Sequence, residues 1–482
     1  MLAICASVSG CAGDKTPKHN GTNVLLIVMD TVRSDRLSCY GNSRNVTPMV
    51  DALANYGYRF ENVFANSSWT LPSHASLFTG VYPAAHRATQ ETLALDDRFP
   101  TLAGILTEAG FQTFGSSTNG IVSAANGLSR GFRTFVPAFR DSVRAALGAA
   151  PTGHPNPNNL AFERFLKTSH RDRPFFAFLN YIDAHAPYEP PEPVRSQFVD
   201  EKFSKNEIAA AIKLRMPDHY MRNAIDERQF ELLGQLYDAE INLVDRAINN
   251  LYAVLEADGR LDDTLIIITS DHGENLGDHG HFAHVFSVHN TLLSVPLIII
   301  PPGALSAGVV RHDTAQLLDL FTTILGSCDV EYTGRADGRN LFAPDAENER
   351  IDSMSEYYYP RQVLAVFDPE ELLASEEKFH PYMKRLRALQ NRDYKLVWGS
   401  DGSRELYRIG EDPGETRDLI AAGVDDPALA RLTAELERMV EAYQGDPPLD
   451  PPPPTGWLGP GFEQRITDPE LLKKLRSLGY VK

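Results

Sequence analysis

The sequence contains few cysteines and no long apolar run. Four cysteines in 482 residues are too few for the disulfide framework of a small secreted domain. They are Cys5, Cys11, Cys39 and Cys328. No stretch has the ~18–20 consecutive apolar residues with which a helix crosses a bilayer. We therefore expect neither a disulfide-held scaffold nor a membrane-spanning helix, and the content of 43% hydrophobic and 23% charged residues is typical of a globular protein.

The chain also lacks an excess of basic residues. Lys and Arg number 46 against 64 Asp and Glu, which gives a formal net charge of −18. General nucleic-acid binders normally carry a basic face, so we expect no nucleic-acid partner. An anionic substrate stays open, because a metal ion or a histidine cluster reverses the sign of the charge locally.

The first residues form a short run of small and apolar side chains. Val8-Ser9-Gly10-Cys11 resembles a bacterial lipobox in which Cys11 is the acylated residue, although the basic start of a signal peptide is missing. We interpret residues 1–22 as a lipoprotein signal remnant and linker. This predicts membrane attachment through a lipidated Cys11 and a place in the bacterial cell envelope, as a periplasmic or outer-membrane lipoprotein. The alternative is a chance run of small residues.

Three continuous apolar runs, 23–29, 174–182 and 264–269, predict strands that are buried on both faces. This pattern is typical of an α/β fold. Polar residues follow each run, and in a parallel sheet the carboxyl ends of the strands share one edge. We therefore expect the residues after these runs to lie together, although an acid there is also a common helix cap. Shorter strands are expected at 111–115 and 294–300, and helices at 47–56, 101–109, 140–148, 232–257 and 317–325.

A stretch rich in hydroxyl groups, residues 67–80, surrounds Pro72. Proline suits the first turn of a helix, so we expect a helix to begin at Pro72-Ser73 with Thr70 just ahead of it. The N-terminus of a helix favours developing negative charge, which makes the Thr70 hydroxyl a candidate nucleophile. The alternative is a Ser/Thr turn that only caps the helix.

Four histidines and three acids fall between residues 271 and 284. Such density after an apolar run indicates a metal or catalytic site. Asp30, Asp271 and His272 would surround one divalent ion, with the Thr70 hydroxyl as a fourth ligand. Zn²⁺ and Mn²⁺ suit this set, whereas Ca²⁺ prefers oxygen ligands alone but stays open. The ion would activate the hydroxyl, and histidines would protonate the leaving group.

The character of the sequence changes near residue 345, where charged helical segments alternate with short strand-like runs. We expect a β-hairpin over 393–408 and a helix over 428–443. A Pro-rich tether and a terminal helix over 468–478 would follow. The predicted divisions are a catalytic domain, a smaller C-terminal subdomain, and the tether with its helix, at 23–344, 345–446 and 447–482.

The motifs at 28–33, 70–80 and 270–274 together resemble the sulfatase family of the alkaline phosphatase-like superfamily, and 295–299 and 405–416 resemble its later motifs. The resemblance implies a large mixed, mostly parallel sheet between helices, with a smaller C-terminal α+β subdomain. It also implies a site with assigned roles. The catalytic residues would be Thr70, His74, His185 and His284, the metal ligands Asp30, Thr70, Asp271 and His272, and the substrate-binding residues Asn119 and His281.

The chain departs from the family at the nucleophile. Sulfatases usually carry a Cys or Ser that is converted to formylglycine, but this chain has Thr70, whose Cβ methyl group prevents that conversion. His74 stands in place of the usual Arg, and Thr31 in place of a second Asp after Asp30. A threonine nucleophile is similar instead to phosphoethanolamine and lipoteichoic acid-type phosphotransferases.

Three functions are therefore open. The first is a metal-dependent hydrolase of a sulfuric or phosphoric ester, acting on a sulfated or phosphorylated small molecule, glycan or lipid. The second is a phosphoryl-group transferase acting on an envelope glycan or lipid. The third is a non-catalytic ligand-binding homologue, which the complete set of metal ligands disfavours.

Overall fold

The computed structural model describes residues 21–149, 156–344 and 352–442, without 361–362, 364–366 and 368–379, together with 469, 470 and 473. The lipobox at Cys11, the Pro-rich tether and most of the terminal helix lie outside these residues, so those predictions stay untested. Within the described part of the chain, no helix is both long enough and apolar enough to cross a membrane.

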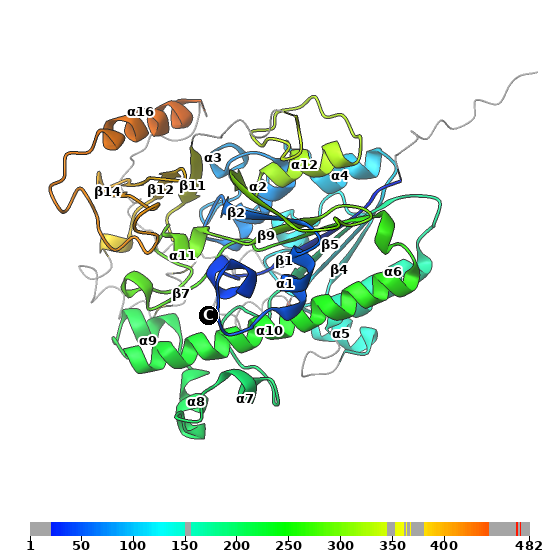
Figure 1. Cartoon of the computed structure of the whole chain (residues 1–482), viewed down its shortest axis with the longest axis horizontal. Helices are drawn as coiled ribbons and strands as arrows, with labels where there is room; N and C mark the ends of the chain where they lie inside the picture. Colours follow the sequence, from blue (N-terminus) through cyan, green and yellow to red (C-terminus); the bar gives the residue numbers. More distant parts are fainter. Residues whose placement is uncertain are drawn as a thin grey trace, which may run out of the picture.

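A large mixed sheet forms the centre of the molecule (Figure 1). Strand β9 is antiparallel to both of its neighbours, β2 and β6, and the remaining pairings in this sheet are parallel. This confirms the predicted mixed, mostly parallel sheet. In spatial order the strands are β10 (Val309–Gln316), β2 (Tyr58–Phe64), β9 (Leu297–Ile300), β6 (Thr264–Thr269), β1 (Asn23–Met29), β5 (Phe175–Tyr181), β3 (Gln112–Ser117) and β4 (Thr134–Pro137).

Strand β1 explains why the centre of the sheet is apolar throughout. Its alternate residues Val24, Leu26 and Val28 pack into the core on one face, and the residues between them pack into the core on the other face. Every side chain of the strand is buried. A strand covered on both sides has few positions that tolerate a polar side chain, so most polar residues fall at its ends or after its last residue.

Helices cover both faces of this sheet (Figure 1). One face carries α2 (Thr70–Thr79), α4 (Leu102–Glu108) and α12 (Asp319–Ser327), and the other carries α1 (Pro48–Ala54), α6 (Pro157–Thr168) and α10 (Glu227–Asp258). Helix α10 starts five residues before its predicted start, because Asp226 and Gln229 form a capping box. It ends where Gly259 takes a positive φ of 77°. The shorter helices are α3 (Pro83–His86), α5 (Asp141–Leu147), α7 (Arg195–Phe198), α8 (Lys205–Ala211), α9 (Met216–Tyr220) and α11 (Asn290–Leu293).

A second, antiparallel sheet follows the first in the sequence. Its strands are β11 (Ser353–Tyr357), β12 (Leu386–Gln390), β13 (Lys395–Gly399) and β14 (Arg404–Tyr407), and α16 (Pro427–Glu441) packs against it. The β13–β14 pair confirms the predicted hairpin, and the sheet with its helix confirms the α+β character of this part of the chain.

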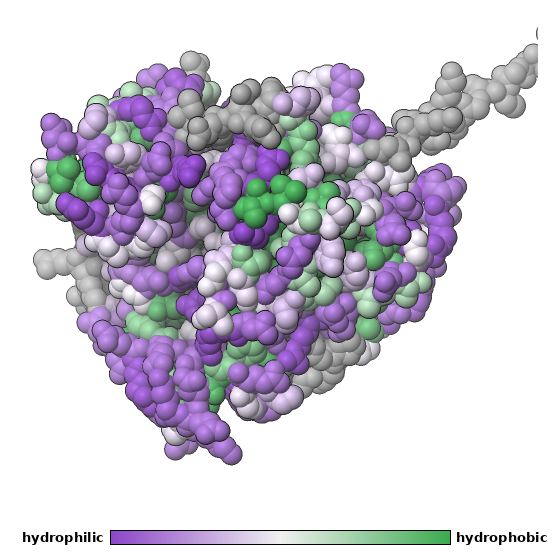
Figure 2. Space-filling model, viewed as in Figure 1, coloured by the Kyte–Doolittle hydropathy of each residue, from purple (hydrophilic) through white to green (hydrophobic). Residues whose placement is uncertain are grey.

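In the large sheet, strands β2, β4 and β10 were not predicted from the sequence. Exposed and buried residues mix along β2 and β10, and β10 is an edge strand whose first residues, Val309 and Val310, are exposed. Neither strand therefore shows a continuous apolar run or a strict alternation. The face in Figure 2 is largely hydrophilic, and its apolar areas are small.

A buried ion pair links β13 of the second sheet to the segment around α11. Lys395 Nζ on β13 lies 2.6 Å from Glu415 Oε1 and donates to Asn290 Oδ1 on α11 at 2.9 Å. The backbone N–H of Asn290 donates to the other oxygen of Glu415 at 2.6 Å. Both charged side chains are almost completely buried, so each charge is compensated by the other and not by water.

Removing one member of this pair should destabilise the protein more than removing both. We expect Lys395→Met to lower the free energy of unfolding by about 3–5 kcal/mol, because Glu415 stays buried without its cation. Adding Glu415→Gln should restore part of the loss. Urea unfolding measures this, with Lys167→Met as the control, since Lys167 is an exposed partner of Glu163 and should cost less than about 0.5 kcal/mol. Equal losses in the Lys395 and Lys167 variants would contradict the account.

Candidate active site

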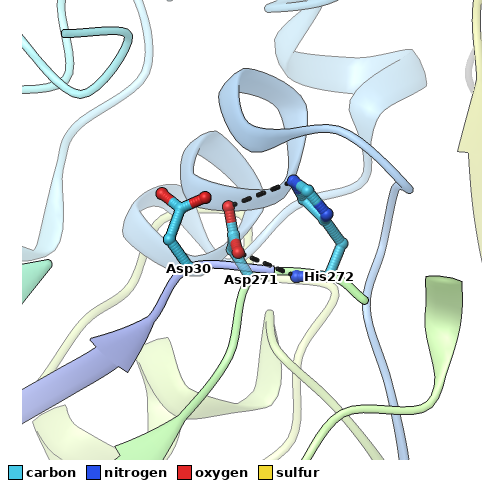
Figure 3. A group of neighbouring side chains, drawn as sticks. All are labelled: Asp30, Asp271 and His272. Atoms are coloured by element: carbon cyan, nitrogen blue, oxygen red, sulfur yellow. Dashed lines mark hydrogen bonds and ion pairs between the residues drawn. The ribbon is translucent and has the colours of Figure 1, made fainter. Parts of the chain in front are cut away.

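The ends of two neighbouring strands bring three ligand groups together (Figure 3). Asp30 directly follows β1, and Asp271 and His272 follow β6, which pairs with β1 in parallel. One ligand atom from each residue lies within 4.8 Å of the others, and all three side chains are buried. The sequence predicts that these residues meet, because the carboxyl ends of parallel strands share one edge of the sheet.

The Thr70 hydroxyl lies next to these groups. Its Oγ1 is 3.3 Å from Nε2 of His272. Helix α2 begins at Thr70 and not at Pro72, so the prediction that Thr70 precedes the helix was wrong by two residues. Pro72 occupies the third helical position, where its missing N–H is tolerated in the first turn. Thr70 therefore still lies at the positive end of the helix dipole.

The carboxylate of Asp30 is held at one oxygen and open at the other. Oδ2 accepts hydrogen bonds from Asn119 Nδ2 at 2.8 Å and from Asn180 Nδ2 at 3.0 Å. Oδ1 is buried and has no hydrogen bond among the described residues. Asn119 thus orients Asp30, and its predicted part in substrate binding stays a prediction. The sequence reading missed Asn180, which lies inside the apolar run of β5.

The carboxylate of Asp271 is arranged in the same way. Oδ1 accepts from the backbone N–H of Thr31 at 3.1 Å and from that of His272 at 2.9 Å. Oδ2 has no hydrogen bond among the described residues, and it lies 3.4 Å from His272 Nε2 and 3.5 Å from His74 Nδ1. Figure 3 shows the two contacts of Asp271 with His272.

These open atoms fit a divalent cation. Two buried carboxylate oxygens without hydrogen bonds are costly unless a cation compensates them. Burial, with the neighbouring Asp271 as a second cause, raises the pKa of Asp30 to about 6. Burial lowers the pKa of His272 to about 3, and its Nδ1 lies 3.0 Å from the carbonyl oxygen of Gly273, so the neutral ring directs Nε2 into the site. Two oxygens, one imidazole nitrogen and a hydroxyl are a donor set for Zn²⁺ or Mn²⁺.

Thr31 ties the two strand ends together in a strained conformation. Its φ is 64°, which is unusual for a β-branched residue. The hydroxyl oxygen lies 2.7 Å from the carbonyl oxygen of Asp30 and 3.0 Å from that of Ala184, and the backbone N–H donates to Asp271. Where the family carries a second Asp, this chain therefore has a residue that braces the loop before His185.

His74 lies in the first turns of α2 and is completely buried. Its Nδ1 donates to the carbonyl oxygen of Thr70 at 2.9 Å, and its ring packs edge-on against Phe78 and Phe178. Nε2 has no hydrogen bond among the described residues. These contacts hold His74 beside Asp271, and its catalytic role stays a prediction.

His185 and His284, which the resemblance assigns to the site, lie beside His272, and their catalytic roles stay predictions. Their ring centroids are 4.8 Å apart, and His284 is 4.7 Å from His272. Burial, and next His284, lower the pKa of His185 to about 3. His284 Nδ1 lies 3.1 Å from Glu274 Oε1, and burial raises the pKa of Glu274 to about 7. Sequence reasoning counted Glu274 only among the acids near His272 and gave it no role.

The dense histidine segment does not form a single cluster. Strands β7 (Asn275–Leu276) and β8 (Phe282–Ala283) pair as a hairpin and reverse the chain between His272 and His284. His281, predicted to bind substrate, lies with its Nδ1 3.3 Å from the Tyr220 hydroxyl. His279 stacks on His289 with ring centroids 3.8 Å apart. The structure thus places His281 in a neighbouring aromatic group, and its contact with substrate stays a prediction.

Comparison with known proteins places the chain in a family. The sulfatase family model matches residues 22–330. The chain belongs to the sulfatase family. It is therefore an ester hydrolase by family, and the motifs at Asp30, Thr70 and Asp271 lie inside the matched region.

Curated relatives of this sulfatase-family chain are distant but cover nearly its full length. The multifunctional alkaline phosphatase superfamily protein PehA of Trinickia caryophylli is 25% identical over 490 residues, 86% of this chain and 93% of that protein. The N-acetylglucosamine-6-O-sulfatase of Bacteroides thetaiotaomicron is 23% identical over 93% of this chain and 91% of its own length.

Solved structures share the fold. The phosphonate monoester hydrolase of Agrobacterium radiobacter superposes with a TM-score of 0.68 at 22% identity, over 88% of this chain and 96% of that one. A protein solved with its substrate D-glucosamine-2-N,6-O-disulfate gives a TM-score of 0.66 at 20% identity, over 89% and 100%.

The Asp30 carboxylate should give the metal-free protein a pH-dependent stability. Its pKa is about 6 in the folded chain against an ordinary 3.8, so between these values the folded state binds more protons than the unfolded state. The free energy of unfolding should therefore fall as pH rises from about 4 to 6, by about 3 kcal/mol at most. Asp30→Asn should remove the share of this fall that Asp30 contributes and should abolish binding of the divalent ion.

Urea unfolding with a chelator across this pH range, together with elemental analysis, measures both effects. Asp245 is the matched control, because burial also raises its pKa to about 6 while it lies on α10 and accepts from the backbone of Met49 and Val50 on α1. Asp245→Asn should flatten the pH dependence and keep the metal. A metal content that Asp30→Asn leaves unchanged would contradict the ligand assignment.

Proposed function

We propose that this chain is a divalent-metal-dependent hydrolase that cleaves a sulfuric or phosphoric ester with the Thr70 hydroxyl as nucleophile. The observation that carries the proposal is the position of Oγ1, 3.3 Å from His272 Nε2 and at the start of α2. The buried oxygens of Asp30 and Asp271 that lack hydrogen bonds belong to the same group. A hydroxyl that only capped the helix would not need them.

Each residue of the site has a task in this reaction. Asp30, Asp271 and His272 would hold the ion, which when bound supplies Lewis acidity to the Thr70 hydroxyl and to a substrate oxygen. Zn²⁺, Mn²⁺ and Ca²⁺ are the candidates, and the imidazole ligand favours the first two. Thr70 Oγ attacks phosphorus or sulfur, and the start of α2 stabilises the negative charge that develops there. His185 and His284 contact the leaving oxygen and the remaining oxygens of the ester.

The threonine nucleophile favours phosphorus over sulfur. A hydroxyl without the aldehyde chemistry of formylglycine forms an ester adduct that water must release by attack at the central atom. Release of the adduct by water is easier to explain for phosphate or phosphonate esters than for sulfates. The names of the relatives, which include both a glucosamine sulfatase and a phosphonate monoester hydrolase, support both ester classes and a glycan as the carrier.

A transferase is the second candidate, and it shares the first half of the reaction. Thr70 would form the same adduct, and an alcohol of an envelope glycan or lipid would replace water as the acceptor. The location in the bacterial envelope that the lipobox at Cys11 predicts supports such an acceptor. A non-catalytic homologue would have no need for the open carboxylate oxygens.

An ester panel tests the proposed function. We expect the metal-loaded enzyme to hydrolyse 4-nitrophenyl phenylphosphonate or a 4-nitrophenyl phosphate faster than 4-nitrophenyl sulfate. All three release the same alcohol, so the comparison isolates the central atom. Thr70→Ala should lower kcat by roughly 10³-fold or more, because the nucleophile is lost. Added glycerol should become esterified with the transferred group only if the chain is a transferase.

Thr79→Ala is the matched control for this test. Thr79 lies in the same helix, where its hydroxyl donates to the carbonyl oxygen of Ala75 at 2.7 Å. The Thr79→Ala variant should keep the activity of the unaltered enzyme. Turnover that survives Thr70→Ala would refute the nucleophile, and no turnover of any ester by the metal-loaded protein would favour the binding homologue.

A further inference from the structure

Helix α10 contacts the loop after Asp30 through the hydroxyl of Tyr237, for which the proposed reaction has no task. The Tyr237 side chain is completely buried. Its hydroxyl donates to the carbonyl oxygen of Thr31 at 2.6 Å and accepts from the backbone N–H of Arg33 at 3.0 Å. Both of these partners are backbone groups of the loop that follows Asp30, so the hydroxyl acts on the path of the chain there.

Side chains hold this loop at three successive backbone N–H groups. The N–H of Thr31 donates to Asp271 Oδ1 at 3.1 Å, and that of Val32 donates to Ser270 Oγ at 2.9 Å. These two acceptors follow β6, whereas the third acceptor, the Tyr237 hydroxyl, comes from α10. Because Tyr237 also donates to the loop, it fixes the peptide groups on both sides of Val32.

The conformation of Thr31 needs such support. Its φ of 64° lies in the left-handed region, which a β-branched residue keeps only where its surroundings hold it there. A return to negative φ would reorient the peptide that carries its N–H against the rest of the loop, so the hydrogen bond to Asp271 Oδ1 depends on this conformation. Thr31 is also the chain neighbour of Asp30. Its backbone thus links the directions of both carboxylates.

We propose that Tyr237 is a positioning residue whose hydroxyl keeps Thr31 at positive φ and thereby fixes the Asp30 and Asp271 carboxylates for a divalent ion. The inference rests on the metal site of the proposed function. Groups that hold the ligands of a metal change its affinity by roughly 10–100-fold when they are substituted. Tyr237 acts through Thr31, and its role involves no transfer of a proton.

Tyr237→Phe removes the hydroxyl and keeps the ring. The ring contact with Tyr188, at a centroid distance of 5.5 Å, should therefore persist. Tyr40→Phe is the matched control. The Tyr40 hydroxyl donates to the carbonyl oxygen of Phe60 at 2.9 Å and accepts from the backbone N–H of Leu297 at 2.9 Å, so it also bridges two backbone groups. These partners lie on β2 and β9, which carry none of the proposed ligands.

The readout is the dissociation constant of the chelator-stripped full chain for Mn²⁺ and for Zn²⁺, with urea unfolding of the metal-free protein beside it. We expect Tyr237→Phe to raise both constants by roughly 10-fold or more. Tyr40→Phe should change them by less than about twofold, although both variants should lower the urea midpoint, since each removes hydrogen bonds to backbone groups.

A second substitution tests whether the effect passes through Thr31. Glycine adopts positive φ about as readily as negative φ, so a Thr31→Gly chain should not need the hydroxyl to keep this conformation. Adding Tyr237→Phe to Thr31→Gly should therefore raise the dissociation constants by less than about threefold. If Tyr237→Phe alone does not fold, the double variant should fold, and the comparison with Thr31→Gly is made there.

Three results would overturn the inference. The first is an unchanged dissociation constant in Tyr237→Phe while the unaltered chain binds the ions. The second is an equal rise with and without Thr31→Gly, which would mean that Tyr237 does not act through Thr31. The third is a failure to fold both with and without Thr31→Gly, which would make the role one of the fold alone. If the unaltered chain binds neither ion, the metal site of the proposed function fails first.

Discussion

The structure depends on two buried carboxylates that face one another. Asp30 and Asp271 are completely enclosed, and each keeps one oxygen without a hydrogen bond among the described residues. Burying such charges costs several kcal/mol each unless a partner compensates them. The amides of Asn119 and Asn180 and the strained backbone of Thr31 hold the other oxygens, so the two open atoms keep their direction. The parallel pairing of β1 with β6 then brings both to one point.

The proposed nucleophile, Thr70, would suit a chemistry different from that of formylglycine. Thr70 takes the position where the family resemblance expects a residue that is converted to formylglycine, and it lies at the first position of α2 beside His272. His74 stands where the resemblance expects an arginine, and its Nδ1 donates to the Thr70 carbonyl oxygen. Beside His272, His284 Nδ1 lies 3.1 Å from Glu274 Oε1. Together these differences favour a hydroxyl that is activated in place.

The sequence predicts those parts of the molecule that have a simple burial pattern. Strands β1, β5 and β6 are covered on both faces and read as unbroken apolar runs, so the polar residues after them could be identified. Strands β2 and β10 mix exposed and buried residues, and their pattern carries no such signal. Asn180 went unnoticed because it lies within an apolar strand. His281 was grouped with His272 because the two are close in sequence, but the β7–β8 hairpin separates them in space. Glu274 contacts Tyr188 and His284 through hydrogen bonds that no spacing in the sequence reveals.

The most direct test of the account is the mass of the enzyme during turnover. An ester with a good leaving group, mixed with metal-loaded protein and quenched within a few turnovers, should leave a fraction of the chain heavier by one phosphoryl or phosphonyl group. Peptide mapping should place this group on Thr70, and the adduct should be absent from Thr70→Ala. Steady hydrolysis without any adduct on Thr70, or with an adduct on another residue, would contradict the central claim that this hydroxyl is the nucleophile.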